Sequence, residues 1–362
     1  MKKRILSALM AAVLALSLFG CSQAPASGDE SGTSSAASQT ESTASQEESS
    51  QPESQYPVTL TDAAGREVTI EEEPEKLVSG YYITTSMLIA LGQQDKLVGI
   101  EAKADSRPIY SLAAPELLEL PNVGTAKQFD LEGCAAMEPD LVILPLKLKD
   151  SVPALEELGI TVLTVNPEDL SLLEETITML GKATGAQEEA QALLDENEET
   201  VSFLEETVGG LEKPTVYLGG NSSFLSTAGS KMYQNTLIEM GGGENVAASI
   251  EDDYWAEVSY EQILEWNPQV IVIVPEAEYT KDDVLSDPQL ADVDAVKNQQ
   301  VYEMPSSFEA WDSPVPSAML GSLWMASVLH EDAYSFDQFK DDAADFYKTF
   351  YGVDIDRDLL TR

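Results

Sequence analysis

The chain has 362 residues, enough for two domains that each bury a substantial core. Its 64 acidic residues outnumber 20 basic ones, and the formal net charge of −44 argues against nucleic-acid binding, because phosphate contacts need clustered Lys and Arg. The single histidine, His330, limits the chemistry further, since a His-ligated metal site, a Ser-His-Asp set or a Cys-His pair would each depend on it. We expect no resident metal or cofactor.

Residues 1–20 have the pattern of a secretory signal. The basic start, Lys2 to Arg4, precedes an apolar run that ends at Phe19 and is too short for a comfortable membrane span. The small residue before Cys21 is similar to the signal of bacterial lipoproteins, in which the cysteine is lipidated and becomes the new N-terminus. We therefore expect Cys21 to anchor the protein to the extracytoplasmic face of a cell membrane, on a Gram-positive surface or in a periplasm. An ordinary cleaved signal is the alternative.

Residues 21–55 are dominated by Ser, Ala, Thr, Gln and Glu. Such a composition buries too little apolar surface to offset chain entropy, so the segment is predicted to be a disordered tether. A tether of this kind lets a folded body range away from the membrane. With Cys21 used for the anchor, Cys134 has no partner for an intramolecular disulfide.

Strands and helices alternate from residue 56 to residue 185, which implies a parallel sheet with helices on its faces. Two short strands around the turn Asp62–Gly65 predict a hairpin. Thr84 is expected to cap the first helix. The predicted strands are 58–60, 67–70, 76–79, 97–100, 139–145 and 161–165, and the predicted helices are 84–92, 131–137, 151–158 and 170–180.

A long amphipathic helix is predicted for Ala186–Val208. Apolar side chains recur three or four residues apart along it, Gly185 precedes it, and Gly209, Gly210 and Pro214 follow it. An ordinary surface helix would have the same pattern. The position of this helix between two α/β segments favours a stiff link between two lobes.

The second half repeats the plan of the first. Its predicted strands are 215–218 and 268–275, and its predicted helices are 232–240, 260–266, 314–329 and 336–351. Glu132 is followed seven residues later by Pro139 and a buried strand, and Glu261 is followed at the same spacing by Pro268 and a buried strand. The sequence thus predicts an α/β fold of two Rossmann-like lobes with mainly parallel sheets, at 56–185 and 211–362, joined by one long α-helix at 186–210. Ligands of such sheets lie beyond the carboxyl ends of the strands, here between the lobes.

Several fragments resemble the solute-binding proteins of ABC importers that carry iron–siderophore complexes, haem and cobalamin, the class with an inter-lobe helix. The resemblance spans roughly Val58 to Tyr351 and implies a monomeric, non-enzymatic protein. Such a protein captures a ferric siderophore, haem or a corrinoid and delivers it to an ABC permease and ATPase. The fragments are Asp62-x-x-Gly65-Arg66-x-Val68, Leu131-Glu132 through Pro139-Asp-Leu-Val-Ile143, Val258-Ser-x-Glu261 through Pro268, Trp311-x-Ser313-Pro314 and Leu320-Gly-x-Leu-Trp324.

The family's glutamates that dock each lobe onto arginines of the permease match Glu132 and Glu261. Helix capping offers an alternative explanation, because Asp130 and Ser259 are N-cap candidates and a carboxylate in the first turn is stabilised by the helix dipole. The same placement in both lobes favours docking.

Candidate ligand contacts lie in loops that follow strands. Aromatic walls suit a flat or bulky chelate, because each ring provides a large contact area at low entropy cost. Trp266 and Trp324 lie in apolar helical patterns and are expected in the core. The predicted ligand-binding residues are Tyr81, Tyr82, Lys127, Phe129, Lys147, Asn221, Ser222, Tyr254, Trp255 and Trp311.

Basic residues are scarce, so those in the first lobe's loops stand out. They either receive anionic groups of a ligand or are solvated charges that balance local acid. Tyr81 or Tyr82 as a direct ligand of iron is a weaker hypothesis, because no second ligand is evident. The loop residues concerned are Lys103, Arg107, Lys127, Lys147 and Lys149.

Three other functions remain open at this stage. A secreted α/β hydrolase is disfavoured because the chain has no G-x-S-x-G elbow and only His330. A surface sensor or adhesin would use the same fold without a need for docking glutamates. A bare divalent cation is disfavoured by the missing histidines, whereas an oxyanion such as molybdate is compatible.

Overall fold

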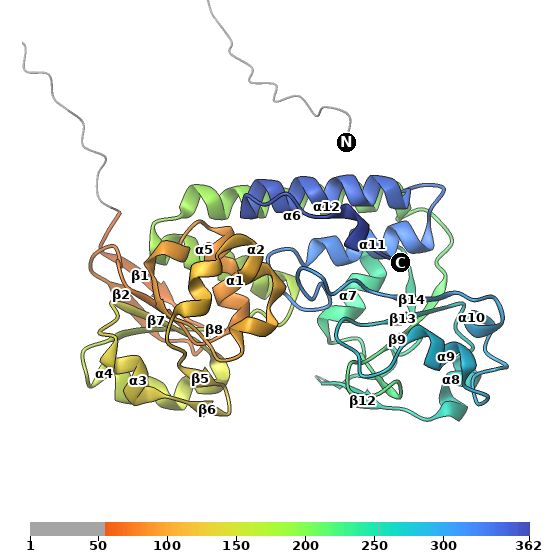
Figure 1. Ribbon diagram of the computed structural model, residues 1–362, viewed down its shortest axis with the longest axis horizontal. Helices are drawn as coiled ribbons and strands as arrows, with labels where there is room; N and C mark the ends of the chain where they lie inside the picture. The colour runs from red at the N-terminus through yellow and green to blue at the C-terminus, as the bar shows by residue number, and fades with distance from the viewer. Residues whose placement is uncertain (1–54, 253) are drawn as a thin grey trace, which may run out of the picture. The chain divides into compact units, whose positions relative to one another are not determined.

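The computed structural model describes residues 55–252 and 254–362. The expected signal, the tether and Cys21 therefore lie outside the described residues. Within the described part, the chain forms two α/β lobes that are connected by one long helix, as predicted (Figure 1).

The N-terminal lobe begins with an antiparallel hairpin of β1 (Val58–Thr61) and β2 (Glu67–Ile70). Its main sheet is parallel and has the order β4-β3-β7-β8. The strands of this sheet are β3 (Leu77–Ser79), β4 (Leu97–Gly99), β7 (Leu141–Pro145) and β8 (Thr161–Val165), and a second small hairpin is formed by β5 (Gly124–Thr125) and β6 (Gln128–Phe129). The helices are α1 (Tyr82–Ala90), α2 (Pro108–Ala113), α3 (Leu131–Ala136), α4 (Val152–Glu156) and α5 (Leu170–Thr184).

The central strand β7 shows why this sheet is parallel and covered on both faces. All five of its residues are buried, as expected for a strand with helices on either side. Leu141 and Ile143 belong to the core cluster that also includes residues of α1 and α5. Val142 and Leu144 belong to the cluster with Cys134 of α3, because successive side chains of a strand point to opposite faces.

The C-terminal lobe has the same plan, with a parallel sheet in the order β11-β9-β13-β14. Alternate residues of its central strand also divide between two core clusters. The strands are β9 (Thr215–Gly219), β11 (Glu244–Asn245), β13 (Val270–Ile273) and β14 (Val301–Glu303), with β10 (Ser226–Thr227) paired antiparallel to β12 (Ala256–Glu257). The helices are α7 (Tyr233–Met240), α8 (Tyr260–Trp266), α9 (Lys281–Ser286), α10 (Asp294–Lys297), α11 (Met319–Leu329) and α12 (Phe336–Tyr351).

The predicted link is α6 (Gln187–Val208), which packs on α5 of the first lobe and on α11 and α7 of the second (Figure 1). Its contact with α5 is close: a Cβ atom added at Gly181 would lie 2.5 Å from the Cβ atom of Ala190. A second connection runs back from the C-terminal lobe, because α12 packs on α11 and also reaches α1. The lobes are therefore joined through α6 and held together again through α12.

Asp62 connects the N-terminal hairpin to the main sheet. Its carboxylate accepts hydrogen bonds from the Thr164 hydroxyl at 2.7 Å and from the guanidinium of Arg66. Burial raises the pKa of Asp62, but the hydrogen bonds from Arg66 and Thr164 outweigh it, and the net pKa is lowered. The Asp62-x-x-Gly65-Arg66 fragment thus has a structural role.

Some local predictions were wrong. Thr84 does not cap α1: the helix begins at Tyr82, and the Thr84 hydroxyl donates to the Tyr81 carbonyl at 2.8 Å from inside the first turn. A hydrogen bond links that hydroxyl to Ser79 of β3, 2.7 Å away. The pattern assigned no element to residues 276–313, where the structure has α9, α10 and β14.

Candidate functional site

A small cavity lies where the loops of the two lobes meet. Its volume is about 20 Å³, close to that of a single water molecule. Side chains of both lobes line it, and most of them are apolar or aromatic. They are Tyr82, Ser86, Arg107, Pro108, Ile109 and Tyr110 from the first lobe and Glu276, Ser306, Phe308, Glu309, Ala310 and Val315 from the second.

Arg107 is the one basic side chain among these lining residues. Its guanidinium carbon lies 4.2 Å from the centre of the Tyr82 ring, a cation–π contact. Its Nη1 atom lies 3.7 Å from Oε1 of Glu276 in the opposite lobe. Burial raises the pKa of the Tyr82 hydroxyl, although a hydrogen bond with Ser313 and the charge of Arg107 oppose this. Tyr82 is therefore a neutral donor beside a fixed positive charge.

Glu101 is hydrogen-bonded to Tyr110, one of the residues of the first lobe that line the cavity. It is buried and accepts hydrogen bonds from the Thr85 hydroxyl at 2.6 Å and the Tyr110 hydroxyl at 2.8 Å. Burial raises its pKa, against the effect of these hydrogen bonds and of the Arg107 charge. These hydrogen bonds link Thr85 of α1 to Tyr110 of α2 through the Glu101 carboxylate.

Glu309 joins the two lobes. It is a buried carboxylate of the C-terminal lobe and accepts hydrogen bonds from Ser86 of α1, from Ser317 at 2.5 Å and from the Tyr351 hydroxyl at 2.8 Å. Burial raises its pKa in spite of these three donors. The last residue of α12, Tyr351, thus meets the N-terminal lobe at the same carboxylate.

Asp312 is a further buried carboxylate near this interface, with 8% of its surface exposed. Burial raises its pKa to about 7, the charge of Glu276 adds to this effect, and a hydrogen bond with Gln234 opposes it. The charge of Asp312 also acts on Tyr82 in the other lobe. The inter-lobe region therefore holds several carboxylates around one guanidinium.

The predicted ligand-binding residues are only partly brought together. Tyr82 lines the cavity, and the ring of Tyr81 packs edge-on against it at 5.3 Å. Tyr254 is 70% exposed, and Phe129 and Trp255 are half-buried against the core. The exposed polar residues that are absent from the cavity lining are Lys127, Lys147, Asn221 and Ser222.

The assignment of Trp311 to the ligand site needs correction. Its side chain is fully buried, its indole N–H donates to the Tyr347 hydroxyl at 3.0 Å, and its ring packs edge-on against Phe339. The adjacent Ser313-Pro314 turn suggested exposure, but α12 covers the ring. Trp324 is a core residue, as predicted.

Four acidic residues of this region and most of its apolar wall are not among the residues that the sequence predicts for the site. Glu101, Glu276, Glu309 and Asp312 had no distinguishing pattern among 64 acidic residues. Arg107 was noted for the scarcity of basic residues, but Lys103, Lys127, Lys147 and Lys149 carried the same signal and are exposed.

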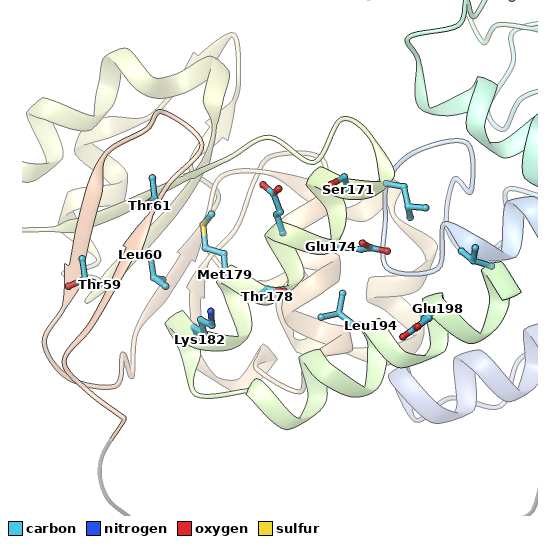
Figure 2. Close-up of a pocket in the computed structure, with 13 residues that line it drawn as sticks. Thr59, Leu60, Thr61, Ser171, Glu174, Thr178, Met179, Lys182, Leu194 and Glu198 are labelled. Carbon is cyan, nitrogen blue, oxygen red and sulfur yellow. The ribbon is translucent and has the colours of Figure 1, made fainter.

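A larger hollow lies elsewhere, on the N-terminal lobe. It has a volume of about 810 Å³ and lies between β1, α5 and α6 (Figure 2). Its lining shares no residue with the inter-lobe cavity. The carboxylates of Glu174 and Glu198 line it together with apolar side chains such as Met179 and Leu194.

Glu132 and Glu261 occupy matching places in the two lobes. Each is exposed in the first turn of a short helix, α3 or α8, and in Figure 1 these helices lie at the lower edge of their lobes while α6 runs along the upper one. The predicted N-caps are confirmed: Asp130 accepts from the Gly133 N–H at 2.9 Å and Ser259 from the Gln262 N–H at 3.2 Å.

Within residues 55–252 and 254–362, no helix is long and apolar enough to span a bilayer. In the same part of the chain, no three acidic, histidine or cysteine side chains converge on a point where a metal ion would bind. His330 lies 3.0 Å from the Gly242 carbonyl oxygen through its Nε2 atom.

Two α/β lobes that share one helix and enclose a site between their loops define the class of two-lobe solute-binding proteins. The family model described as periplasmic binding protein matches residues 77–308, so the chain belongs to that family. This confirms the resemblance to binding proteins of ABC importers.

Curated relatives extend over most of the chain. The molybdate-binding protein MolA of Haemophilus influenzae is 24% identical over 330 residues, 84% of this chain and 93% of MolA. An uncharacterised ABC transporter substrate-binding lipoprotein of Bacillus subtilis is 29% identical over 69% of this chain and 78% of its own length. A cobalamin-binding protein of Halobacterium salinarum is 26% identical over 68% of this chain and 66% of its own length.

Solved structures show the same fold. A periplasmic solute-binding protein of Veillonella parvula superposes with a TM-score of 0.74 at 26% identity, over 83% of this chain and 95% of that one. MolA with molybdate bound superposes with a TM-score of 0.73 at 22% identity, over 83% of this chain and 99% of MolA. The ligands of such relatives differ, so family membership leaves the ligand of this chain open.

Proposed function

We propose that this protein binds a metal chelate between its lobes and delivers it to an ABC permease. The chelate would be a metal held by an organic ligand, such as a ferric siderophore, haem or a corrinoid. The observation that carries the proposal is the lining of the inter-lobe cavity. Most of its side chains are apolar or aromatic, and a single guanidinium, Arg107, supplies its positive charge. Organic ligands prefer such walls, with a few polar groups that orient them.

The cavity volume of about 20 Å³ is far smaller than a chelate. The lobes or their loops therefore have to part for binding. The link α6 and the contacts of α12 with α1 favour a small change of lobe spacing over a wide hinge motion.

A free oxyanion is the second candidate. The similarity to MolA along 84% of the chain supports it. Against it, a small dianion needs several convergent donors, whereas the one guanidinium of the cavity already faces Glu276.

Native mass spectrometry separates these candidates. The purified protein is incubated with haemin, cyanocobalamin, a ferric hydroxamate and molybdate, one at a time. We expect a stoichiometric adduct with one of the three chelates and none with molybdate. An adduct with molybdate alone replaces the chelate proposal with the oxyanion one.

We also propose that Glu132 and Glu261 dock the lobes on the permease. Their exposure and matching positions on α3 and α8 support this. The variant Glu132→Lys/Glu261→Lys should retain ligand affinity and lose uptake by cells. Glu157→Lys, an exposed change at the end of α4, is the control and should transport normally. Normal uptake by the double variant would refute docking through these residues.

The lipid anchor at Cys21 remains part of the proposal, supported by the signal sequence and by similarity to the B. subtilis lipoprotein. A Cys21→Ser variant should appear in the soluble extracytoplasmic fraction, whereas Cys134→Ser should stay with the membrane. Membrane retention of Cys21→Ser would argue against lipidation.

A further inference from the structure

We propose that Glu276 is an internal substitute for an anionic group of the ligand: it pairs with Arg107 across the lobes and must be displaced for that group to bind. Glu276 would thereby select ligands that present an anionic group at Arg107. This inference rests on the proposed ligand-binding function and adds a selection rule to it.

Arg107 is placed to keep its position when its partner leaves. Its side chain is 28% exposed and stacks on the Tyr82 ring, whose hydroxyl end is held by a hydrogen bond with Ser313. The guanidinium plane offers several N–H donors and matches a carboxylate or phosphate in two-point contact. The contact with Glu276, at 3.7 Å, is too long to be such a hydrogen bond. The guanidinium N–H groups of Arg107 therefore make no hydrogen bond to Glu276.

Glu276 is held in an unfavourable backbone conformation. Its φ is +59°, in the left-handed region that non-glycine residues rarely adopt. Neighbouring contacts maintain this turn: the Glu278 N–H donates to the Asn221 carbonyl, and the Tyr279 hydroxyl donates to the Gly220 carbonyl, both at 2.9 Å. Strain maintained in this way is typical of ligand clamps and switch loops.

The opposite side of the ion pair has a similar feature. Lys103, four residues before Arg107 in the loop after β4, has a φ of +69°. Both loops that carry the ion pair therefore contain a residue in the left-handed region.

The charges around the pair explain why displacement is selective. A ligand anion that binds beside Glu276 without displacing it would place two anionic groups at the one guanidinium of Arg107. An anion that replaces Glu276 leaves the charge balance unchanged. The side chain of Glu276 is 54% exposed, so it moves into water at little cost. Ligands without an anionic group gain nothing from this exchange.

The first test needs no ligand. The arginine reagent phenylglyoxal is applied to the full chain, and peptide mass spectrometry follows the modification of Arg107. We expect Glu276→Gln to raise the modification rate of Arg107 severalfold, because a neutral amide does not stabilise the unreactive guanidinium cation as the carboxylate does. Glu278→Gln is the matched control in the same loop and should leave the rate unchanged. Equal rates in the wild type and Glu276→Gln overturn the proposed pairing.

The second test uses probes of different charge in calorimetric titrations. Haemin carries two carboxylates, whereas dicyanocobinamide, a corrinoid without the nucleotide loop, carries neither a carboxylate nor a phosphodiester. Glu276→Gln should bind haemin roughly threefold to fivefold more tightly than the wild type, the range expected for loss of an exposed competing ion pair. Its affinity for dicyanocobinamide should not change. The double variant Arg107→Gln/Glu276→Gln should lose the gain for haemin.

The two tests separate the failure of this inference from that of the proposed function. A raised modification rate without binding of either probe keeps the pairing of Glu276 and removes these chelates as ligands. Binding of haemin that weakens in Glu276→Gln, or that strengthens equally for both probes, overturns the selection by Glu276 while the proposed function stands.

Discussion

Ser86 of α1 donates its hydroxyl hydrogen to the buried carboxylate of Glu309, which belongs to the other lobe. Tyr351, the last residue of α12, completes this junction with a hydrogen bond to the same carboxylate. Within residues 55–252 and 254–362, the donors to Glu309 are the hydroxyl groups of Ser86, Ser317 and Tyr351, and they stabilise its charge. The junction is therefore sensitive to the loss of a single hydroxyl.

Replacement of Ser86 by alanine should destabilise the protein by about 1–3 kcal/mol, the cost of a buried acceptor that loses one donor. Urea unfolding at pH 7 measures the change. Ser327→Ala is the matched control, because Ser327 is also a buried helical serine but bonds to Trp324 within its own helix. A smaller loss in Ser86→Ala than in Ser327→Ala would show that the junction adds little.

Asp312 should make stability depend on pH. Burial raises its pKa to about 7 from the ordinary value of 3.8, so between these values the folded state holds a proton that the unfolded state has lost. Stability therefore falls as pH rises through this window, by at most about 4 kcal/mol at about 1.4 kcal/mol per pH unit. Asp312→Asn removes this penalty.

Urea unfolding at pH 4 and pH 8 tests the role of Asp312. The Asp312→Asn variant should exceed the wild type in stability at pH 8 and match it at pH 4. Asp150→Asn, a change at an exposed aspartate, should show no such difference. A gain of equal size at both pH values would mean that the effect is not the titration of Asp312.

Because α5 and α6 approach each other closely at Gly181, we expect any larger residue at this position to destabilise the protein. A Cβ atom there would meet the Cβ atom of Ala190 at 2.5 Å, so Gly181→Ala should force the helices apart. Overpacking typically costs about 1–3 kcal/mol, which exceeds the gain of about 1 kcal/mol from replacing a helical glycine. Thermal unfolding should show a lower midpoint.

A compensating change tests whether that steric contact is the cause. Ala190→Gly in the Gly181→Ala background should restore part of the lost stability, because it removes the methyl group that clashes. Gly210→Ala is the control, since no atom lies within 4 Å of its added Cβ. Failure of the double variant to recover would locate the damage in the backbone contact with Ala186.

Cys134 should resist thiol reagents in the folded protein. It is fully buried, and burial, together with the charge of Asp130, raises the pKa of its thiol to about 11. Iodoacetamide at pH 8 should leave the Cys134 peptide unmodified and should modify it fully in urea, as read by mass spectrometry. Rapid modification without denaturant would show that α3 opens readily.

The periodicity of apolar residues in the sequence correctly predicted several helices and strands. The bounds of α8 and α12 match the prediction, because Ser259 and Ser335 cap helices whose apolar residues recur at helical spacing. The strand Thr161–Val165 was likewise predicted at its observed limits, since four of its five residues are buried. These features depend on neighbours in the sequence.

The site depends on residues far apart in the sequence, and there prediction was poorer. Arg107 and Glu276 come together only because two sheets present their loops to each other, and no local pattern marks either residue. Trp311 was misassigned because its burial depends on Phe339 and Tyr347 of α12, a helix that the local turn sequence does not reveal. The matching motifs in the two halves indicated the two lobes. They did not show which basic loop residue, Arg107 or one of the lysines, lines the inter-lobe cavity.

The junction at Glu309 has a consequence for the order in which the chain acquires its structure. Ser86 and Glu309 are 223 positions apart, and Ser86 and Tyr351 are 265 apart. During synthesis from the N-terminus, the first lobe can fold while its partner surface does not yet exist. Docking of the lobes must therefore be a late step that awaits α12, and contacts of such long range slow folding. A chain cut before residue 336 would keep Glu309 but lack Tyr351 and the contact of α12 with α1, so its lobes would be held together less firmly.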